Sequence, residues 1–236
     1  MSRKLGILGG MGPLATVEFM QKIISQTPAH NDQQHIPMLV SNNPQIPDRT
    51  AFLISNGADP YPALKQGMEQ LQQAGAECIV MPCNTAHYWY PRLANSCNVH
   101  TISILDSVVK EAHCRNYCKV GVMATTATMQ TRMYQTKLAQ KQIATIGTTS
   151  PQQQAVMDGI YAVKAGDIKL GHQLMKPVFD SLIAQGAEAV ILGCTEIPVA
   201  LAELAHNQPE LCLDSLNILA KACIEWATED TVELVA

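Results

Sequence analysis

The sequence contains few charged and few aromatic residues. Of its 236 residues, 15% are charged and 5% are aromatic, whereas 47% are hydrophobic. It has no run of basic residues, and its formal net charge is −4 at pH 7. This balance argues against nucleic acid and anionic membrane surfaces as partners. The apolar fraction predicts a sizeable buried core.

Segments that direct a chain to a membrane or out of the cell are also missing. No stretch approaches the roughly 18 apolar residues of a membrane span. Residues 1–6 lead directly into a strand and a glycine loop, without the apolar stretch and small-residue cleavage site of a signal peptide. The expected location is therefore the cytoplasm, and no membrane partner is expected.

Motifs for zinc and for dinucleotides are incomplete. None of the eight cysteines forms a Cys-x-x-Cys pair, and Cys114 and Cys118, beside His113, have no second ligand pair at matching spacing. Free thiols are therefore expected rather than a metal site or a disulfide framework. The segment 9–12 reads Gly-Gly-x-Gly and lacks the spacing and the following acid of a dinucleotide site, which leaves a small carboxylate or phosphate group as a possible ligand.

One nine-residue pattern occurs twice, at residues 75–83 and 186–194. Each copy has Gly-Ala-Glu, then an apolar run, then a cysteine eight residues after the glycine. Cys83 and Cys194 are therefore 111 positions apart. Each copy is typical of a helix that ends at the glycine, followed by a buried parallel strand with the cysteine at its carboxyl end.

Two further similarities support an internal duplication. Residues 4–9 resemble residues 119–124, and Leu105-Asp106-Ser107 resembles Leu213-Asp214-Ser215. In the first of these registers, three residues of one half align with three of the other: Thr16, Phe19 and Lys22 with Thr131, Tyr134 and Lys137.

The duplication predicts an α/β fold of two similar lobes, each a three-layer αβα sandwich with a parallel-type sheet. A pseudo-twofold axis would relate the lobes, with the active site in the cleft between them. We assign residues 1–100 and 212–236 to lobe one, which carries Cys83, and residues 101–211 to lobe two, which carries Cys194.

Local signals predict the elements that surround this cleft. We expect a polar loop at 41–50, a kink at Pro177 in the helix 167–185, and a frayed tail at 228–236. The expected strands are 4–8, 36–40, 79–81, 101–105 and 120–124, and the expected helices are 14–26, 59–74, 150–166, 167–185 and 215–227.

Open parallel sheets bind ligands at the carboxyl ends of their strands, so the two lobes would bring Cys83 and Cys194 to opposite sides of one ligand. Each thiol would also begin a helix, whose dipole lowers a thiol pKa. Two opposed thiols suit the removal of a proton from one face of a carbon and the return of a proton to the other face.

Such a reaction must stabilise the negative charge that develops next to a carboxylate. The groups placed for this by the duplication are Asn84, Thr85, Thr195 and the loop Gly10-Met11-Gly12 in the neighbourhood of the cysteines. In the second lobe, Thr125 and Thr126 follow the strand that corresponds to the first strand. Their hydroxyls would substitute for the glycines there, as an anion or ammonium site requires.

Four segments together resemble the cofactor-independent aspartate/glutamate racemases, most closely the aspartate racemase branch. They are Leu8 to Thr16, Pro47-Asp48-Arg49-Thr50, Pro82-Cys83-Asn84-Thr85-Ala86-His87 and Gly193-Cys194-Thr195-Glu196-Ile197. The resemblance covers nearly the whole chain. Its Cys-Asn-Thr-Ala and Gly-Cys-Thr motifs are highly specific for the superfamily and less specific for the substrate.

The resemblance implies catalysis by Cys83 and Cys194 without pyridoxal phosphate or another cofactor, in a homodimer. In the aspartate branch, residues that match Arg49 and Lys164 hold the side-chain carboxylate, which favours a dicarboxylic amino acid. Glutamate racemases have Cys-Thr-His where this chain has Cys-Thr-Glu. This difference makes Glu196 a candidate for orienting Cys194 or the substrate ammonium group.

Three other interpretations remain open. His87 could pair with Cys83 in a cysteine hydrolase, although this would leave Cys194 without a role. The chain could be a two-lobed binding protein without chemistry. It could also be a glutamate racemase, a racemase of broader specificity, or another two-cysteine isomerase of the same superfamily.

Overall fold

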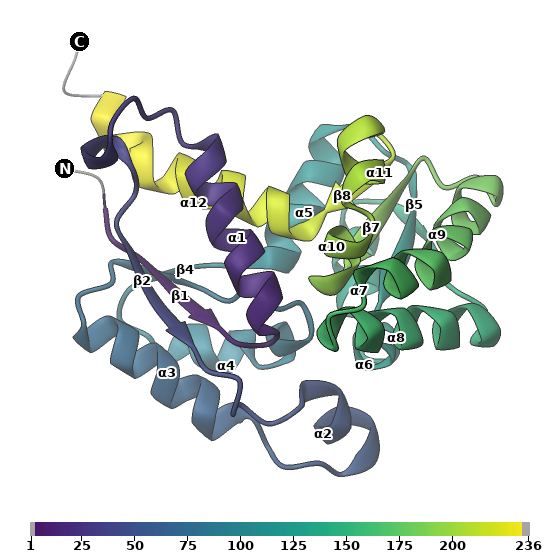
Figure 1. Ribbon diagram of the computed structural model, residues 1–236, viewed down its shortest axis with the longest axis horizontal. Coiled ribbons are helices and arrows are strands. Elements are labelled where there is room, and N and C mark those ends of the chain that lie inside the picture. The colour runs from purple at the N-terminus through teal and green to yellow at the C-terminus, as the bar shows by residue number, and fades with distance from the viewer. Residues whose placement is uncertain (1–2, 233–236) are drawn as a thin grey trace.

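The computed structural model describes residues 3–232, with the side chains of residues 230–232 left out. The chain folds into two sheets of four parallel strands, ordered β2-β1-β3-β4 and β6-β5-β7-β8, each with helices on both faces (Figure 1). The predicted pair of αβα lobes is confirmed. None of the helices within the described part of the chain has the length and apolar character needed to cross a bilayer.

The first half holds one sheet and its helices. Its elements are β1 (Leu5–Gly9), α1 (Pro13–Gln26), η1 (Asp32–Gln34), β2 (Met38–Asn42), α2 (Arg49–Ser55), α3 (Tyr61–Gln73), β3 (Cys78–Val80), η2 (Thr85–Tyr88), α4 (Tyr90–Asn95) and β4 (His100–Ile102). The second half repeats the pattern. Its elements are α5 (Ile104–Cys114), β5 (Lys119–Ala124), α6 (Thr126–Gln130), α7 (Met133–Gln140), β6 (Ala144–Ile146), α8 (Ser150–Lys164), α9 (Ile168–Ala184), β7 (Ala189–Gly193), α10 (Glu196–Ala200), α11 (Ala202–Asn207), β8 (Cys212–Asp214) and α12 (Ser215–Val232).

The predicted duplication is visible in equivalent contacts of the two lobes. Gly75 and Gly186 both end a helix with a φ of 91°, a backbone conformation that costs glycine little. The following glutamates are also equivalent, because the Glu77 carboxylate accepts from the amide of Lys4 and the Glu188 carboxylate accepts from the amide of Lys119. These bonds tie the start of each repeated strand to the start of the strand beside it.

Two lysines that align in the two halves also form equivalent ion pairs. The Nζ of Lys22 lies 3.1 Å from a carboxylate oxygen of Asp214, and the Nζ of Lys137 lies 2.5 Å from one of Asp106. Lys22 lies in α1, which follows β1, and Lys137 lies in α7, the second helix after β5. Asp106 lies in the first turn of α5, and Asp214 directly precedes α12. The repeat is therefore present at the level of side-chain contacts.

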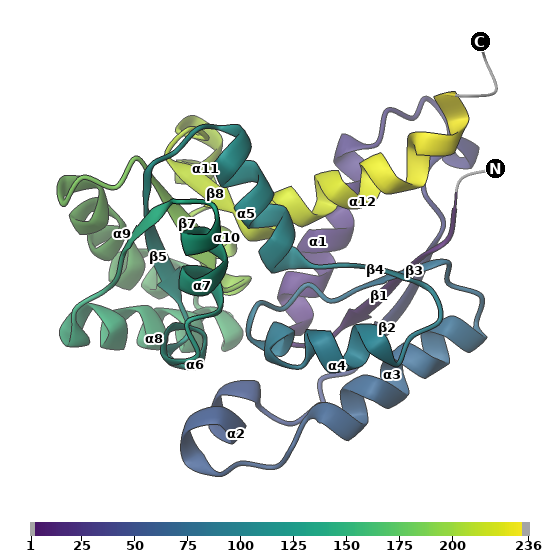
Figure 2. The same cartoon turned by 180° about the vertical axis from the view of Figure 1, so that it is seen from behind.

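A shared core joins the lobes. Apolar residues of α1, α5, α7 and α12 pack in one cluster against the facing sides of both sheets, with Phe19 and Tyr134 among its largest fully buried side chains. In Figures 1 and 2, α1 and α12 lie side by side over the first sheet, with α3 and α4 on its opposite face. A second cluster lies under α8, α9 and α10, and a third lies between the first sheet and α3. Burial of apolar surface in these clusters is the main favourable contribution to folding.

Strand pairing corrects the predicted division between the lobes. Residues 101–102 were assigned to lobe two and residues 212–214 to lobe one. However, β4 pairs with β3 in the first sheet, and β8 pairs with β7 in the second. The strand expected at 101–105 is also shorter, because the Ser103 hydroxyl accepts from the amide of Asp106 and caps α5. The chain therefore crosses between the sheets at the helices α5 and α12.

Two local predictions also need correction. The loop expected at 41–50 is shorter, since β2 continues to Asn42 and the Asp48 carboxylate caps α2 by accepting from the amide of Ala51 at 2.7 Å. The helix α9 runs from Ile168 to Ala184 with Pro177 inside it, and the kink expected at this proline stays a prediction. The tail expected from 228 continues α12 to Val232, and residues 233–236 lie outside the described residues.

Candidate active site

The two repeated strands carry their cysteines to a single cavity. Cys83 follows β3 and Cys194 follows β7, and both line a narrow cavity of about 10 Å³ between the lobes. Both thiols are free and their residues are buried, with exposed fractions of 5% and 6%. A cavity of this volume holds about one water molecule, so the cleft is closed around its two sulfur atoms.

Most of the residues predicted for the site line this cavity. Besides the two cysteines, the predicted residues found there are Met11, Arg49, Asn84, Thr85, Thr125, Lys164, Thr195 and Glu196. Two other lining residues, Asp48 and Thr50, belong to the segment Pro47-Asp48-Arg49-Thr50 that resembles the family, but they were not predicted as site residues. Asp48 is the cap of α2 and Thr50 lies in its first turn. An N-cap signal at Asp48 could have identified this helix.

Two predicted residues lie elsewhere. Gly10 lines an adjoining cavity, and its amide donates to the hydroxyl of Thr16 at 2.9 Å, so this N–H is not available to an anion. Thr126 begins α6 and lines a third cavity near α8. Its hydroxyl accepts from Gln153 and its amide donates to the sulfur of Met157. Both polar groups of Thr126 therefore face lobe two rather than the cysteines.

Arg49 is buried, not a solvated surface residue. Only 8% of it is exposed, because it lies in the first turn of α2, against the glycine loop. Its Nη1 donates to the carbonyls of Ile46 and Pro47, and its Nη2 donates to the carbonyl of Met11. Its Nε has no partner although it is buried. An unpartnered buried donor of this kind can receive an oxygen of a carboxylate.

Glu196 is the electrostatic counterpart of Arg49 in lobe two. It is 3% exposed, and its Oε2 accepts from the thiol of Cys194 at 3.0 Å and from the hydroxyl of Thr195 at 3.3 Å. Its Oε1 is buried without a partner. A Cβ built on Gly12 would lie 3.1 Å from this atom, so the glycine leaves room beside it. Oε1 can therefore receive a donor such as an ammonium group.

The charge of Glu196 affects two neighbouring groups. Burial raises the pKa of the Cys194 thiol well above its ordinary value, and the Glu196 carboxylate raises it further. The prediction that a helix dipole lowers this pKa is wrong, because α10 has only five residues and the carboxylate lies nearer. Lys164 lies exposed at the cavity edge. Partial burial lowers the pKa of its ammonium group, but the charges of Glu196 and Cys194 raise it, and the resulting pKa lies above the ordinary value.

His87 is held by two backbone groups rather than by the cysteine thiol. Its Nδ1 lies 2.8 Å from the carbonyl of Cys83, and its Nε2 accepts from the amide of Ile104 at 3.0 Å. A ring that accepts at Nε2 carries its proton on Nδ1 when neutral. Burial lowers its pKa to about 4. Because both ring nitrogens are engaged, His87 cannot act as the base of a Cys-His hydrolase.

The side chain of Asn84 is held by groups from the second half of the chain. Its Oδ1 accepts from the Tyr134 hydroxyl at 2.5 Å, and its Nδ2 donates to the Ser215 hydroxyl at 3.1 Å. The hydroxyl of Thr85 forms a cluster with those of Thr125 and Thr128 at 2.9 and 3.1 Å. Hydroxyl and amide groups of both lobes therefore bond to one another beside the cysteines.

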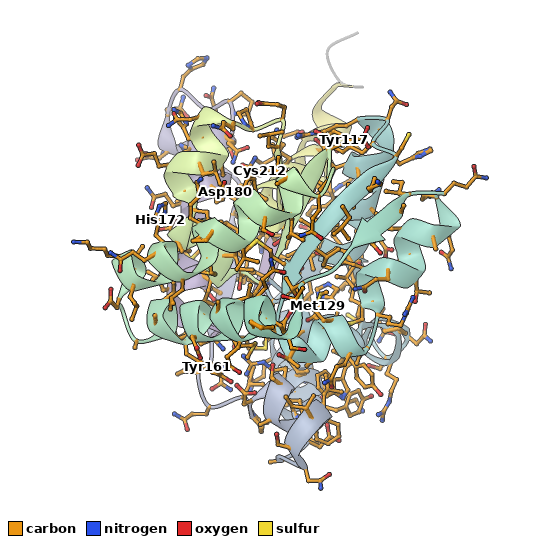
Figure 3. All side chains as sticks on the ribbon, turned by 90° about the vertical axis from the view of Figure 1, so that its right-hand side faces the viewer. Tyr117, Met129, Tyr161, His172, Asp180 and Cys212 are labelled. Carbon is orange, nitrogen blue, oxygen red and sulfur yellow. The ribbon has the colours of Figure 1, made fainter. Side chains whose placement is uncertain are left out.

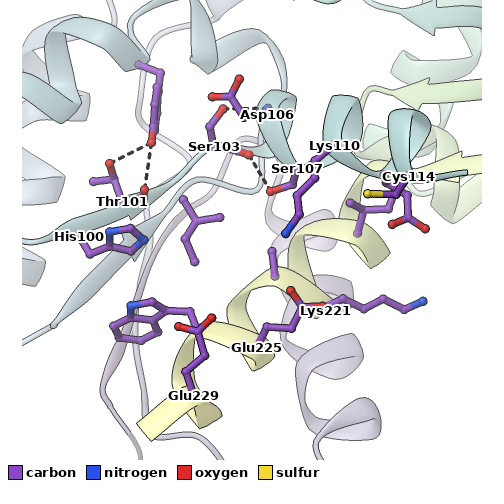
Figure 4. A pocket seen from close by; sticks show the side chains of 16 residues that line it. His100, Thr101, Ser103, Asp106, Ser107, Lys110, Cys114, Lys221, Glu225 and Glu229 are labelled. Carbon is purple, nitrogen blue, oxygen red and sulfur yellow. Dashed lines mark hydrogen bonds between the residues drawn. The ribbon is translucent and has the colours of Figure 1, made fainter. Parts of the chain in front are cut away.

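Other cavities lack the cysteines. One of about 300 Å³ adjoins the cysteine cavity and shares Asp48, Arg49, Lys164 and Glu196 with it. Another, of about 800 Å³, lies between β4, α5 and α12 and is lined by His100, Lys110 and other polar side chains (Figure 4). On the outer side of lobe two, Tyr161 and His172 lie on α8 and α9, at the surface that Figure 3 presents to the viewer.

Comparison with known proteins gives the family. The broad specificity amino-acid racemase RacX of Bacillus subtilis is 30% identical over 93% of this chain and 96% of its own length. An aspartate racemase structure from Picrophilus torridus is 33% identical, with a TM-score of 0.86 over 95% of this chain and 94% of that one.

Glutamate racemase of Francisella tularensis, in complex with D-glutamate, shares the fold at 18% identity. Its TM-score is 0.71, over 98% of this chain and 83% of that one. The Asp/Glu/Hydantoin racemase family matches residues 8–223, most of the described chain. A family match of this extent, with two cysteines at the carboxyl ends of duplicated strands that line one cavity, establishes that this chain belongs to the Asp/Glu/Hydantoin racemase family.

Proposed function

We propose that this protein is an amino-acid racemase that interconverts L- and D-aspartate by proton transfer between Cys83 and Cys194, without a cofactor. The observation that carries the proposal is one cavity lined by both thiols, two cationic side chains and an unpartnered carboxylate oxygen. Similarity to an aspartate racemase and to a broad-specificity amino-acid racemase supports the same activity.

Charge complementarity favours a dicarboxylic amino acid. Aspartate brings two carboxylates and one ammonium group, while the cavity offers Arg49, Lys164 and Glu196. The free Nε of Arg49 and the Nζ of Lys164 would hold carboxylate oxygens, and Oε1 of Glu196 would accept from the ammonium group. Asp48 also lines the cavity, but one of its carboxylate oxygens already accepts from the amide of Ala51.

The proposed reaction begins with Cys83 as thiolate and Cys194 as thiol. The Cys83 sulfur takes the α-hydrogen from one face of the substrate, and the Cys194 sulfur gives its proton to the other face. The reaction thus ends with Cys83 protonated and Cys194 as thiolate. The hydrogen bond from the Cys194 thiol to Glu196 agrees with this starting state, since only a protonated sulfur donates. The reverse direction exchanges the two roles.

The developing negative charge on the substrate needs hydrogen-bond donors. The hydroxyls of Thr85 and Thr125 lie in the cavity wall beside the two cysteines. Thr195 contributes a third hydroxyl, which bonds to Glu196. We propose that these three threonines surround the substrate carboxylate during the transfer. A homodimer, as expected from the family resemblance, remains a prediction for solution measurements.

The test of the function is hydrogen exchange at the α-carbon. Purified protein is incubated with L-aspartate in D₂O, and the α-hydrogen signal is followed by NMR. We expect the signal to disappear while D-aspartate accumulates with deuterium at the α-carbon. A Cys114→Ser variant, altered at an exposed cysteine outside the cleft, should behave like the natural protein. Folded protein without α-hydrogen exchange would contradict the proposal.

A broader amino-acid racemase is the second candidate, and the adjoining cavity favours it. That cavity of about 300 Å³ opens beside the proposed carboxylate clamp, and apolar side chains form much of its wall, including Leu14, Ile46 and Val199. Such a wall suits larger or less polar side chains than that of aspartate. Turnover of a panel of L-amino acids would distinguish the two candidates.

The clamp itself is tested by Arg49→Ala. We expect this change to raise KM for aspartate at least about 10-fold more than KM for alanine, because alanine has no side-chain carboxylate that could lose the contact with Arg49. Arg92→Ala is the matched control, since Arg92 lies over the ring of Tyr61 and does not line the cavity. Equal effects of Arg49→Ala on both substrates would refute the clamp.

A further inference from the structure

A chain of buried hydrogen bonds connects the two strand ends that carry the cysteines. The Tyr134 hydroxyl donates to Oδ1 of Asn84, and Nδ2 of Asn84 donates to the hydroxyl of Ser215. The Ser215 hydroxyl donates to the carbonyl of Leu192 at 2.7 Å. Asn84 directly follows Cys83, and Leu192 precedes Cys194 by two residues. The chain therefore runs from one thiol segment to the other through Ser215, which does not line the cavity.

Tyr134 contacts both ends of this connection by itself. Its hydroxyl bonds to Asn84 in lobe one, while its ring packs against Gly193 in lobe two, immediately before Cys194. A Cβ built on Gly193 would lie 2.9 Å from Cε2 of the ring, which is too close for any side chain there. Tyr134 is fully buried. Burial, with the nearby Cys194, raises the pKa of its phenol far above the ordinary value, so it remains a hydrogen-bond donor.

The internal duplication separates the role of the ring from the role of the hydroxyl. Tyr134 aligns with Phe19 of lobe one, in the register that also aligns Lys22 with Lys137. Both aromatic rings are fully buried in the shared core. Phenylalanine therefore fills the equivalent position without an oxygen. The hydroxyl of Tyr134 exists on one side of the pseudo-twofold axis only, where it reaches across to the other lobe.

We propose that Tyr134 is a positioning residue for the racemase reaction: through Asn84 and Gly193 it fixes the separation of the Cys83 and Cys194 sulfur atoms. This inference rests on the proposed two-thiol mechanism. Proton transfer requires each sulfur to lie close to the α-carbon, and a displacement of about 1 Å can lower the rate roughly 100-fold. A bond between the two segments that does not touch the substrate can supply this precision.

The test removes the hydroxyl and keeps the ring. We expect Tyr134→Phe to lower kcat about 10- to 100-fold in both directions, with KM for aspartate changed less than about 2-fold. Ser215→Ala should act in the same direction, because it breaks the next bond of the chain. The matched control is Tyr90→Phe, which loses a hydroxyl bonded to Thr101, outside the cysteine cavity. It should retain the natural kcat.

An isotope measurement distinguishes positioning from general destabilisation. The measurement is the ratio of deuterium in the recovered substrate to product formed, in D₂O. We expect Tyr134→Phe to raise this ratio in at least one direction of the reaction. If the variant displaces one thiol, that thiol protonates the intermediate more slowly. The other thiol still removes the α-hydrogen and returns a hydrogen to the same face, which regenerates the substrate with deuterium. A partly unfolded population would lower both processes equally. An unchanged exchange ratio together with an unchanged kcat would overturn the proposal.

Backbone amide exchange provides a measurement that does not need turnover. We expect Tyr134→Phe, but not Tyr90→Phe, to lose protection at residues 83–87 and at residues 193–197. Natural protein without aspartate turnover would contradict the proposed function, and amide exchange would still decide whether Tyr134 couples the two segments. Unchanged protection at 193–197 in Tyr134→Phe would overturn the coupling.

Discussion

Glu196 and His87 lie beside the two cysteines but differ in their electrostatic roles, because one is a carboxylate and the other is a neutral imidazole. Glu196 keeps a carboxylate oxygen unpartnered in the cavity and accepts from the thiol of Cys194. His87 is a neutral clamp, with both nitrogens bonded to the backbone. The first bonds directly to the thiol of Cys194, whereas the second fixes the segment that carries Cys83. The two residues therefore make different predictions.

Glu196→Gln should impair the reaction without disrupting the fold. Glutamine can still accept a hydrogen bond from the thiol. It has no negative charge, however, and therefore does not attract the thiol proton or an ammonium group electrostatically. We expect kcat/KM for aspartate to fall about 100-fold, in the usual range for lost acid–base assistance. The pKa of Cys194 should also fall, because a negative neighbour is removed.

Steady-state kinetics and the pH dependence of iodoacetamide alkylation at Cys194 check these two effects. Glu188→Gln is the control, since Glu188 lies at the opposite end of β7 and binds the amides of Cys118 and Lys119. An alkylation profile of Glu196→Gln that matches the natural protein would contradict the proposed interaction.

His87 should make the protein less stable as the pH falls from about 6.5 towards 4. In this window the unfolded state binds a proton at its ordinary pKa of 6.5, while the folded state, with a pKa of about 4, does not. Folding stability therefore falls with the pH, by about 3 kcal/mol in total. Urea unfolding at pH 7, 6 and 5 measures this effect. His87→Gln should be less stable at pH 7 but show a smaller dependence on pH; equal slopes would exclude His87 as the cause.

At the scale of the elements, each repeated strand depends on the glycine that ends the preceding helix. Gly186 has a φ of 91°, and a Cβ placed there would meet only Nζ of Lys119, at 3.9 Å. The cost of a side chain at this position is therefore conformational rather than steric. The same holds for Gly75 in lobe one, where the only neighbour is Nζ of Lys4 at the same distance.

Gly186→Ala should lower the free energy of unfolding by about 1 kcal/mol, the cost of a left-handed backbone for a non-glycine residue. For a chain of this size, this corresponds to a decrease in Tm of about 2–4 °C. Circular dichroism during thermal unfolding measures it. Gly147→Ala is the control, because Gly147 has no positive φ and a Cβ there would have ordinary van der Waals contact with Met129. Equal Tm values for both variants would disagree with the conformational explanation.

At the scale of the whole molecule, the proposed reaction needs one sulfur atom from each lobe. The shared core of α1, α5, α7 and α12 joins the lobes, so that both cysteines line one closed cavity. That cavity of about 10 Å³ cannot hold an amino acid. The proposed two-thiol reaction therefore requires the residues around the cleft to move apart when the substrate binds.

Cys83→Ser and Cys194→Ser should each lower kcat for racemisation at least about 1000-fold, since neither lobe holds a second thiol at the cavity. Calorimetric titration with aspartate should still detect binding by both variants, because the charged groups remain. Cys114→Ser controls for the loss of a thiol as such. Either variant racemising within about 2-fold of the natural rate would contradict the two-thiol mechanism. Loss of aspartate binding in both serine variants would contradict the proposal that the charged groups of the cavity bind the substrate.

The structure supports predictions that rested on local or repeated signals. The offset between the Gly-Ala-Glu copies located β3 and β7 and the cysteines after them. The sequence aligned Lys22 with Lys137, and the structure shows that these two lysines form equivalent ion pairs. The boundary between the lobes was not predictable in this way. Whether 101–102 and 212–214 pair with one sheet or the other depends on partners distant in the sequence.

The sequence by itself determined the duplicated α/β architecture and the two cysteines at the strand ends, because glycine turns, apolar runs and repeat spacing are properties of adjacent residues. Only the tertiary structure decided the environment of each thiol. The bonds from Tyr134 to Asn84 and from Asn84 to Ser215 join residues 50 and 131 positions apart. The burial that raises the pKa of Cys194 likewise depends on how the lobes close, which no local pattern encodes.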